Sequence, residues 1–288
     1  MTKQEFEIHP CFKLNGTHFS RMHLHKVAYS FIKEGQPYEE RVGNFLLDWL
    51  NDDYDDIKVR TSGSTGKPKV IFIDKQKMVN SALATGKYFK VKEETKALMC
   101  LPPKHIGGMM MMVRAMTLGW HLDIVKPSSN PLDKLYKTYD FCAMTPFQLD
   151  NSLSRLHLIK KLIVGGGHIS ENLKQMVQGI PTKVYETFGM TETVSHIAAR
   201  KVNNRKSNKT EPKPFKTLPK ISVASDEHNQ LIIKAPKLLD EPLLTNDIVE
   251  IETYKKFYWK GRADNVINSG GVKIHPEEVE KKLQKLIT

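Results

Sequence analysis

Residues 97–125 read ALMCLPPKHIGGMMMMVRAMTLGWHLDIV, with two short apolar runs on either side of a longer apolar helical pattern. The runs 97–101 and 122–125 have the length of buried strands, and 108–118 has the length of a buried helix. A helix between two strands lets the second strand run parallel to the first. The segment therefore predicts an α/β protein with largely parallel sheets and flanking helices.

The same alternation continues on both sides of this segment. Further runs of strand length lie at 70–73, 141–143, 161–164 and 183–186. Helical patterns that we expect to flank the sheet lie at 38–50, 76–89, 130–137, 146–153 and 170–178. The pattern then changes to short runs separated by turn residues, at 220–223, 230–234, 247–251 and 257–260. This change predicts a small β-rich subdomain after the parallel part.

The carboxyl-terminal part of the chain predicts a second domain. Pro276, followed by two glutamates, is a good helix start, and the helical pattern covers 276–286. Because this helix would end near Thr288 without a partner to pack against, we expect an incomplete domain at 261–288. Residues 1–260 would form the first domain.

The positive charge of the chain is concentrated in one segment. Lys and Arg number 44 against 32 Asp and Glu, a net charge of +12. Eight of the basic residues and one acid, Glu211, lie between Arg200 and Lys220. We expect a solvated basic loop at about 200–220, and steering of phosphate-rich ligands is the alternative. Since Phe215 is its single aromatic residue, no ladder for stacking bases is present, and we expect no nucleic-acid partner.

Targeting and cysteine patterns point to the cytoplasm. No apolar run reaches the ~20 residues that a membrane-spanning helix needs, and the start MTKQEFEIHP has no signal-peptide core. Cys11, Cys100 and Cys142 lack metal-ligand spacing and cannot all pair. We therefore expect reduced thiols, no membrane span and a cytoplasmic protein.

The most distinctive local pattern is TSGSTGKPK at residues 61–69. Glycines allow the backbone to approach a ligand closely, while hydroxyls, amides and lysines can bind phosphate oxygens. The spacing differs from that of a Walker A loop, because Gly63 and Gly66 are separated by two residues and Pro68 follows Lys67. A surface turn rich in serine and glycine is the alternative.

Further motifs follow this loop in a fixed order. They are LPPKHIGG at 101–108, VGGG at 164–167, YETFGMTET at 185–193, LTND at 244–247 and GRADNVINSGGVKI at 261–274. Together with 61–69 they resemble the adenylate-forming superfamily, which includes acyl-CoA synthetases, luciferases and the adenylation domains of peptide synthetases. Two positions depart from its usual pattern: Asn246 replaces a glycine, and Phe188 stands where tyrosine is more frequent.

The resemblance implies a two-step reaction with ATP, Mg²⁺ and CoA. A carboxylate attacks the α-phosphate of ATP to give an acyl-adenylate and pyrophosphate, and the thiol of CoA then displaces AMP. Thr191 would donate to the α-phosphate and Glu192 would ligate Mg²⁺, so that these two residues and His105 are the expected catalytic residues. The expected nucleotide-binding residues are Thr61, Ser62, Gly63, Ser64, Thr65, Gly66, Lys67, Lys69, Gly166, Gly167, Glu186, Thr187, Phe188, Gly189, Asp247 and Arg262.

The acid to be activated is suggested by a closer resemblance. The HIGG run with an arginine nine residues after its histidine, and MTPFQL at 144–149, resemble the o-succinylbenzoate–CoA ligases of menaquinone synthesis. Their substrate keeps one carboxylate free, and Arg114 could pair with it. The expected substrate-binding residues are His105, Arg114, Gly165 and Gly189, and Met109–112 would form an adaptable wall.

Alternatives remain open at this site. The methionines could be core, and Arg114 or His105 could have structural partners. Asp247 could be a turn aspartate, and Glu192 could stabilise a helix start. The acid could also be another aryl or fatty acid, and a homodimer is not excluded.

Two departures from the superfamily affect activity. Only 60 residues precede Thr61, and the chain ends soon after Asp264, the expected hinge residue. In the superfamily a lid after the hinge carries a lysine that meets the acyl and phosphate oxygens. We therefore expect this chain to bind ATP or an acyl-adenylate but to adenylate weakly, and a nucleotide-binding remnant is the alternative.

Overall fold

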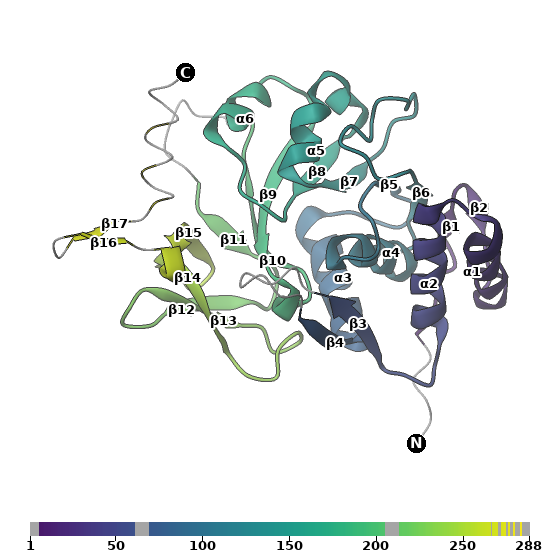
Figure 1. Ribbon diagram of the computed structural model, residues 1–288, viewed down its shortest axis with the longest axis horizontal. Coiled ribbons are helices and arrows are strands. Elements are labelled where there is room, and N and C mark those ends of the chain that lie inside the picture. Colours follow the sequence, from purple (N-terminus) through teal and green to yellow (C-terminus); the bar gives the residue numbers. More distant parts are fainter. Residues whose placement is uncertain are drawn as a thin grey trace.

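A single sheet of thirteen strands runs through the molecule in the computed structural model, which describes residues 6–60, 69–204, 213–265, 267–269 and 272–274 together with Pro276, Val279 and Leu283 (Figure 1). The strand order is β12-β13-β14-β15-β11-β10-β9-β8-β7-β5-β6-β1-β2. The pairs from β1 through β6, β5, β7 and β8 to β9 are parallel, and the other pairs are antiparallel. The predicted α/β class is therefore confirmed.

The strands and helices have the following bounds. The parallel half and its amino-terminal edge contain β1 (Lys13–Leu14), β2 (Thr17–His18), β5 (Lys96–Met99), β6 (His121–Ile124), β7 (Phe141–Met144), β8 (Lys161–Val164) and β9 (Lys183–Gly189). The antiparallel half contains β10 (His196–Lys201), β11 (Phe215–Thr217), β12 (Ser222–Ser225), β13 (Gln230–Lys234), β14 (Leu243–Thr253) and β15 (Lys256–Arg262). The helices are α1 (Arg21–Glu34), α2 (Pro37–Leu50), α3 (Lys75–Phe89), α4 (Ile106–Leu118), α5 (Pro146–Asn151) and α6 (Glu171–Met176), with short 3₁₀ helices η1 (Leu153–Leu158), η2 (Thr191–Thr193) and η3 (Ala263–Asn265).

Two small antiparallel sheets lie apart from the large one. They are β3 (Asp56–Arg60) with β4 (Val70–Asp74), and β16 (Ile267–Ser269) with β17 (Val272–Ile274). The helix expected at 276–286 lies almost entirely outside the described residues. None of the described helices combines the length and apolar composition that a membrane crossing needs.

The central parallel strand β7 is buried on both faces, which explains its continuous apolar sequence. Along β7, Phe141 and Ala143 join the core that contains the buried residues of α3 and α4, and Cys142 and Met144 join the core under α5 and η1. Since successive side chains of a strand point to opposite faces, each helical layer covers one face of the sheet (Figure 1).

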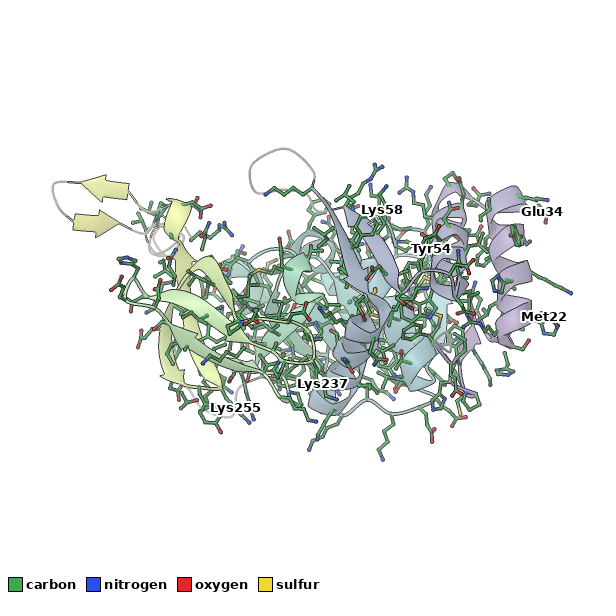
Figure 2. All side chains as sticks on the ribbon, turned by 90° about the horizontal axis from the view of Figure 1, so that it is seen from below. Met22, Glu34, Tyr54, Lys58, Lys237 and Lys255 are labelled. Carbon is green, nitrogen blue, oxygen red and sulfur yellow. The ribbon has the colours of Figure 1, made fainter. Side chains whose placement is uncertain are left out.

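Helices α1 and α2 add an outer layer beside this body. Ser20 caps α1 by accepting a hydrogen bond from the amide of His23, and Gln36 with Glu39 forms a capping box at the start of α2. The inner face of α2 is apolar and buried. Figure 2 shows Met22 and Glu34 on α1 pointing away from the molecule.

Several expectations about the elements need correction. Residues 130–137 form turns rather than a helix, with Leu132 buried as an anchor. Pro131 lacks a backbone donor, and the backbone amides of Asp133 and Leu135 make short-range turn bonds to Asn130 and Leu132. The basic segment about 200–220 is also not simply a loop, because Arg200 and Lys201 end β10 and Phe215–Thr217 forms β11. Its residues 205–212 lie outside the described part of the chain.

The order of the parallel strands reverses at β5. The chain passes from β5 to its neighbour β6 on one side, and then returns to β7 on the other side of β5. In parallel sheets, ligands bind at the carboxyl ends of strands where the order reverses in this way. This edge is therefore where a site is expected on topology alone.

Candidate functional site

The carboxyl edge of the parallel strands carries many of the residues that the motifs singled out. The loop to His105 follows β5, the glycines Gly165 and Gly166 follow β8, and Thr191 follows β9. The loop 61–68 lies outside the described residues, and the described Lys69 is exposed just before β4. Three motifs that are distant in sequence are thus brought to one edge of the sheet.

The glycine-rich loop after β8 is shaped by close backbone contacts. Thr187 on β9 donates its hydroxyl to the carbonyl of Val164 at 3.0 Å. A Cβ atom at Gly165 would lie 2.6 Å from this hydroxyl oxygen, so a larger residue there would displace the Thr187 hydroxyl from its bond to Val164. Gly166 adopts a φ of +78°, which a residue with a side chain rarely adopts. The loop thereby presents backbone groups with no side chain in front of them.

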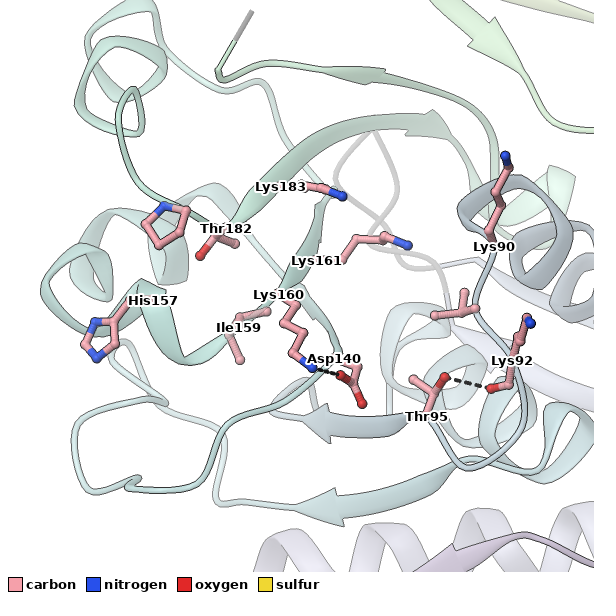
Figure 3. A pocket seen from close by; sticks show the side chains of 12 residues that line it. Lys90, Lys92, Thr95, Asp140, His157, Ile159, Lys160, Lys161, Thr182 and Lys183 are labelled. Carbon is pink, nitrogen blue, oxygen red and sulfur yellow. Dashed lines mark hydrogen bonds and ion pairs between the residues drawn. The ribbon is translucent and has the colours of Figure 1, made fainter.

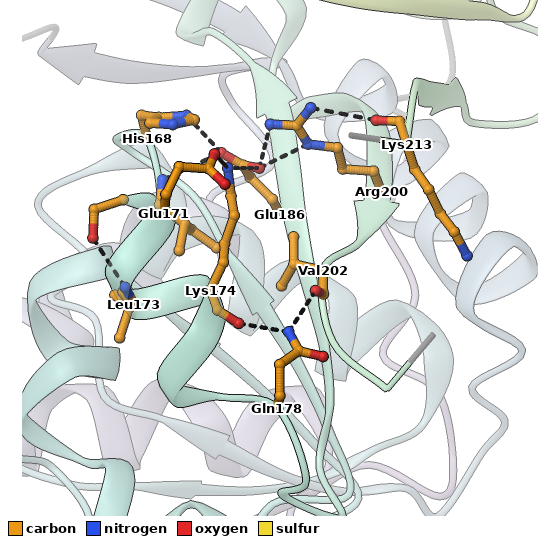
Figure 4. Close-up of polar contacts among 11 residues, drawn as sticks. His168, Glu171, Leu173, Lys174, Gln178, Glu186, Arg200, Val202 and Lys213 are labelled. Carbon is orange, nitrogen blue, oxygen red and sulfur yellow. Dashed lines mark hydrogen bonds and ion pairs between the residues drawn. The ribbon is translucent and has the colours of Figure 1, made fainter. Parts of the chain in front are cut away.

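Glu186 on β9 fixes the base of this loop through an ion-pair cluster (Figure 4). Arg200 donates to its Oε2 through Nε at 2.8 Å and Nη2 at 2.7 Å. His168 Nδ1 lies 3.0 Å from Oε1, which also accepts from the amide of Ile169 at 3.2 Å. Lys174 Nζ is 3.9 Å from Oε2. The carboxylate expected to bind nucleotide is therefore occupied by neighbouring protein groups.

The protonation of Glu186 follows from these partners. Burial alone would raise its pKa, but the hydrogen bond from His168 and the positive charges of Arg200 and Lys174 outweigh it and lower the pKa to about 2. The group is thus a carboxylate at any ordinary pH, and it orients His168 and the following loop.

The turn after β9 is tight and strained. Gly189 is required by the approach of the chain, since a Cβ there would lie 2.4 Å from the carbonyl oxygen of Ser195. The hydroxyl of Thr193 donates to the carbonyls of Met190 and Ser195 and accepts from the amide of Met190. Val194 has a φ of 66° and a ψ of −50°, a γ-turn conformation that costs a β-branched residue about 1–3 kcal/mol.

This strained turn holds two motif residues at the surface. Thr191 is half-buried and Glu192 is exposed, and within the described ranges no hydrogen bond or ion pair engages the Glu192 carboxylate. A carboxylate with free oxygens on a rigid turn fits a hard cation such as Mg²⁺. Thr191 lies beside it with its hydroxyl available.

Asp247 on β14 is buried and is held in place by neighbouring side chains. Trp259 on β15 donates its indole N–H to Asp247 Oδ1 at 2.8 Å, and the side chain is 6% exposed. Burial raises its pKa, although the Trp259 bond and the charge of Arg262 act in the opposite direction. Arg262 also pairs with Asp264 through two bonds of 2.9 Å.

A stacked pair connects Asp247 with the glycine-rich loop. The ring of His168 lies 6.1 Å from that of Trp259, at an interplanar angle of 30°. Glu186 on β9 contacts His168 in the loop after β8, and His168 stacks on Trp259 of β15. Because Trp259 also donates to Asp247 of β14, the four residues form a continuous chain of contacts. Phe188 packs against Phe257 at 5.2 Å instead of standing free.

Arg114 on α4 is a buried cation beside the turn after β9. Its guanidinium donates from Nη2 to the hydroxyl of Ser195 at 2.7 Å and from Nε to that of Thr85 at 3.3 Å. His196 Nδ1 lies 3.4 Å from Nη2. Arg114 is 1% exposed, and among the described residues no carboxylate forms an ion pair with it.

The charge of Arg114 is not compensated by its histidine neighbour. Burial and the adjacent guanidinium lower the pKa of His196 well below its ordinary value, so the ring is neutral. Its Nδ1 can then accept from Arg114 while Nε2 donates to Thr85 Oγ1, 3.4 Å away. Burial lowers the pKa of Arg114 to about 9, which leaves the guanidinium charged at neutral pH. A buried charge without a counter-ion is costly, and an anionic ligand would relieve it.

The other residues expected to bind the acid differ from Arg114 in their burial. His105 is exposed at the start of α4, and burial together with Lys104 and Arg41 lowers its pKa. Met110, Met111 and Met112 are completely buried in the core and Met109 is 7% exposed, which favours the core alternative for the methionine run. Within the described residues the carboxylate-binding candidate is thus Arg114.

Sequence reasoning missed the groups that support the site. Arg200 was assigned to a loop, and His168, His196 and Trp259 were not singled out. His168 directly follows one recognised motif, His196 lies three residues after another, and Trp259 lies two residues before a third, so their positions were the available signal. Their partners come from other strands and could be identified only in three dimensions.

This strand order, with a glycine-rich loop after β8, is typical of α/β proteins that bind a nucleotide at the carboxyl edge of the sheet. The family described as AMP-binding enzyme matches residues 60–232. The chain belongs to this AMP-binding enzyme family.

Solved and curated relatives agree with this assignment. The crystal structure of an acyl-CoA synthetase (AMP-forming)/AMP-acid ligase II-like protein from Dyadobacter fermentans is 34% identical, with a TM-score of 0.74 over 91% of this chain and 75% of that chain. A 2-succinylbenzoate–CoA ligase of Haemophilus influenzae is 28% identical over 77% of this chain and 51% of that protein.

One further solved structure shows the same fold with ligands bound. The O-succinylbenzoate coenzyme A synthetase of Bacillus subtilis, in complex with ATP and magnesium ion, is 22% identical, with a TM-score of 0.67 over 78% of this chain and 54% of that chain. The chain spans about half the length of the curated relatives it matches.

Proposed function

We propose that this chain binds ATP and a dicarboxylic aromatic acid, and that it takes part in activating the acid as an acyl-adenylate for transfer to CoA. The acid that fits best is o-succinylbenzoate, in menaquinone synthesis in the cytoplasm. The observation that carries the substrate assignment is the buried, uncompensated guanidinium of Arg114. It matches the second carboxylate of such an acid, which must be bound but is not activated.

The residues would divide the work between nucleotide and acid. Residues 61–67 and Lys69 would hold the terminal phosphates, and Gly166 and Gly167, supported by Glu186 and Thr187, would lie against the adenine. Asp247 would accept from the ribose hydroxyls, with Arg262 beside it and Trp259 holding it in place. Gly165, Gly189 and Phe188 would border the space between nucleotide and acid.

The chemical step would depend on positioning and charge. Thr191 would donate to the α-phosphate, and Glu192 would hold Mg²⁺, which neutralises phosphate charge when bound. His105 would lie at the entrance to the acid pocket. Residues 261–288 would begin a second domain with Asp264 at its hinge, although β15 extends to Arg262 and thus crosses the division we expected.

Calorimetry with matched ligands tests this proposal. We would titrate AMP, a hydrolysis-resistant mimic of o-succinylbenzoyl-adenylate, and the same mimic without the ring carboxylate. Arg114→Gln should weaken binding of the full mimic by about tenfold or more, because a charge-assisted contact is lost. Binding of AMP and of the mimic without the carboxylate should stay unchanged.

Two further variants make the experiment decisive. Arg114→Lys keeps the charge and should retain part of the preference, and Arg155→Gln removes an arginine under the opposite face of the sheet and should have no effect. An equal response to both mimics in the wild-type chain would exclude o-succinylbenzoate and favour a simpler aryl or fatty acid. No binding of AMP would contradict the proposed function as a whole and favour a remnant that has lost nucleotide binding.

A further inference from the structure

A cavity lies at the edge of the sheet opposite the candidate nucleotide site, at the amino ends of the parallel strands (Figure 3). It has a volume of about 550 Å³ and lies where β8 begins at Lys161 and β9 begins at Lys183. This volume is within the range of small-molecule sites. Because β8 and β9 present their carboxyl ends to the candidate nucleotide site, the two sites lie at opposite ends of the same strands.

Lysines dominate the lining of this cavity. Five of them, Lys90, Lys92, Lys160, Lys161 and Lys183, line it together with one acid, Asp140. Figure 3 shows the side chains of Lys161 and Lys183 extending in the same direction, toward the side where Lys90 and Lys92 stand. We call these five residues the lysine cluster.

The charges of the lysine cluster are only partly engaged by the protein. Lys160 pairs with Asp140 at 2.7 Å, and Lys161 donates to the carbonyl of Phe89. No ion pair or hydrogen bond of the ammonium groups of Lys90, Lys92 and Lys183 is found with any residue that the structure describes. The cavity therefore has an excess of positive charge that an anion would balance.

The charge of Lys183 acts on two neighbouring lysines, one inside the cluster and one outside it. Burial lowers the pKa of Lys161, and the charge of Lys183 lowers it further. The pKa of Lys201 is lowered by burial and then by Lys183 and Lys213. Like charges held this closely are unfavourable, and a bound anion would remove the cost.

The lining also indicates which anion fits. Thr95 and Thr182 donate their hydroxyls to the carbonyls of Lys92 and Leu156, so that these hydrogens are already used. Among the residues that the structure describes, the lining contains no arginine, whose planar fork would favour a carboxylate, and no Phe, Tyr or Trp on which a base could stack. Several mobile point charges around a concave space suit a compact ligand with several phosphates.

We propose that the lysine cluster is a binding site for a small polyphosphate anion, such as inorganic pyrophosphate or triphosphate, separate from the candidate nucleotide site. It does not depend on the reaction proposed above. The phosphate tail of a nucleoside triphosphate has the same chemistry, and an extended nucleic acid would need the stacking surfaces and length that this cavity lacks.

The test is calorimetric titration of the full chain with sodium triphosphate in the absence of metal. The variant Lys92→Gln/Lys183→Gln should bind at least about tenfold more weakly, and wild-type binding should weaken as salt increases. The matched control Lys26→Gln/Lys234→Gln removes two exposed lysines from α1 and β13 and should bind like the wild type. An equal loss in both variants, or in neither, would overturn the proposal.

Three further binding experiments show whether the variants are folded and which kind of phosphate ligand occupies the cluster. AMP binding should be the same in both double variants, which shows an intact candidate nucleotide site. A nucleoside triphosphate that does not displace triphosphate from the cluster indicates a free polyphosphate, and displacement indicates a nucleotide tail; both support the site. Tighter binding of a single-stranded RNA, lost equally in both double variants, would contradict it.

A measurement on the unmodified chain does not depend on any variant. Triphosphate should protect the lysine cluster from acetylation, as measured by mass spectrometry, while Lys26 and Lys234 react as before. Uniform protection, or none, would overturn the proposal.

Discussion

Two buried charged side chains in this molecule have opposite surroundings. Glu186 is surrounded by Arg200, His168 and Lys174, whereas Arg114 has only neutral neighbours among the described residues. The motif containing Glu186 could be recognised in the sequence, but its role as the centre of an ion-pair cluster could not, because its partners come from separate elements. The arginine could likewise be selected from its spacing, while its isolation from carboxylates is a property of the packed structure.

The Glu186 cluster predicts a loss of stability on neutralisation. Glu186→Gln should lower the free energy of unfolding at pH 7 by about 3 kcal/mol, because three cationic or donor groups lose a buried carboxylate. The pKa falls from 4.5 to about 2 on folding, so this stabilisation is complete above pH ~4.5 and is lost as the pH falls toward ~2. Urea unfolding of both proteins across this range measures it.

The exposed pair of Glu250 and Lys260 supplies the control. Glu250→Gln should change the unfolding free energy by less than about 1 kcal/mol, since solvent screens the pair. If the difference between wild type and Glu186→Gln stayed constant down to pH 2, the cluster would not be the origin of the stabilisation.

Elements with both faces buried were the easiest to predict from sequence. The run that forms β7 is apolar throughout, those of β5 and β8 are apolar after a first lysine, and α4 has the length and composition of a core helix. The short strands β10 and β11 were missed because their sequences are interrupted by basic residues. Arg200 nevertheless suits β10, since it pairs with Glu186 and stacks 4.3 Å from the ring of Phe215.

Two adjacent glycines at the start of α4 test how closely this helix packs against the preceding loop. A Cβ at Gly108 would lie 2.4 Å from the carbonyl oxygen of Pro102, whereas at Gly107 it would lie 3.3 Å from the movable end of Leu101. Gly108→Ala should therefore destabilise the protein by about 2 kcal/mol or more. Gly107→Ala should be neutral or stabilise by up to ~1 kcal/mol through helix propensity.

Thermal and urea unfolding of the two variants measure this difference. Since both changes have the same intrinsic effect on helix formation, the contrast isolates the contact with the loop 101–105. Equal stabilities would mean that this loop moves freely away from α4.

The whole molecule is more continuous than its sequence indicates. The change of pattern after residue 220 predicted a separate β-rich part, and the strands are present, but β11 joins them to β10 in the same sheet. Pairing between residues distant in the chain has no local signature, so this continuity could not be predicted. It places Asp247 and Trp259 next to the loop after β8.

Hydrogen exchange should reveal a gradient along this sheet. The amides of β7, which is buried on both faces and paired on both sides, should open only with global unfolding. Those of the edge strands β2 and β12 should exchange through local opening, faster by several orders of magnitude. Native-state exchange followed by mass spectrometry checks this order, and equal protection of β12 and β7 would contradict it.

The position of β1 between β6 and the edge strand β2 has a consequence for synthesis on the ribosome. Lys13 pairs in parallel with His121, so β1 must wait until the whole chain between these two residues has emerged. The strands β5 and β6 are close in sequence and can pair first. The sheet of the nascent chain thus forms from its middle outward. The hairpin of β1 and β2 is therefore the segment that depends longest on protection by chaperones.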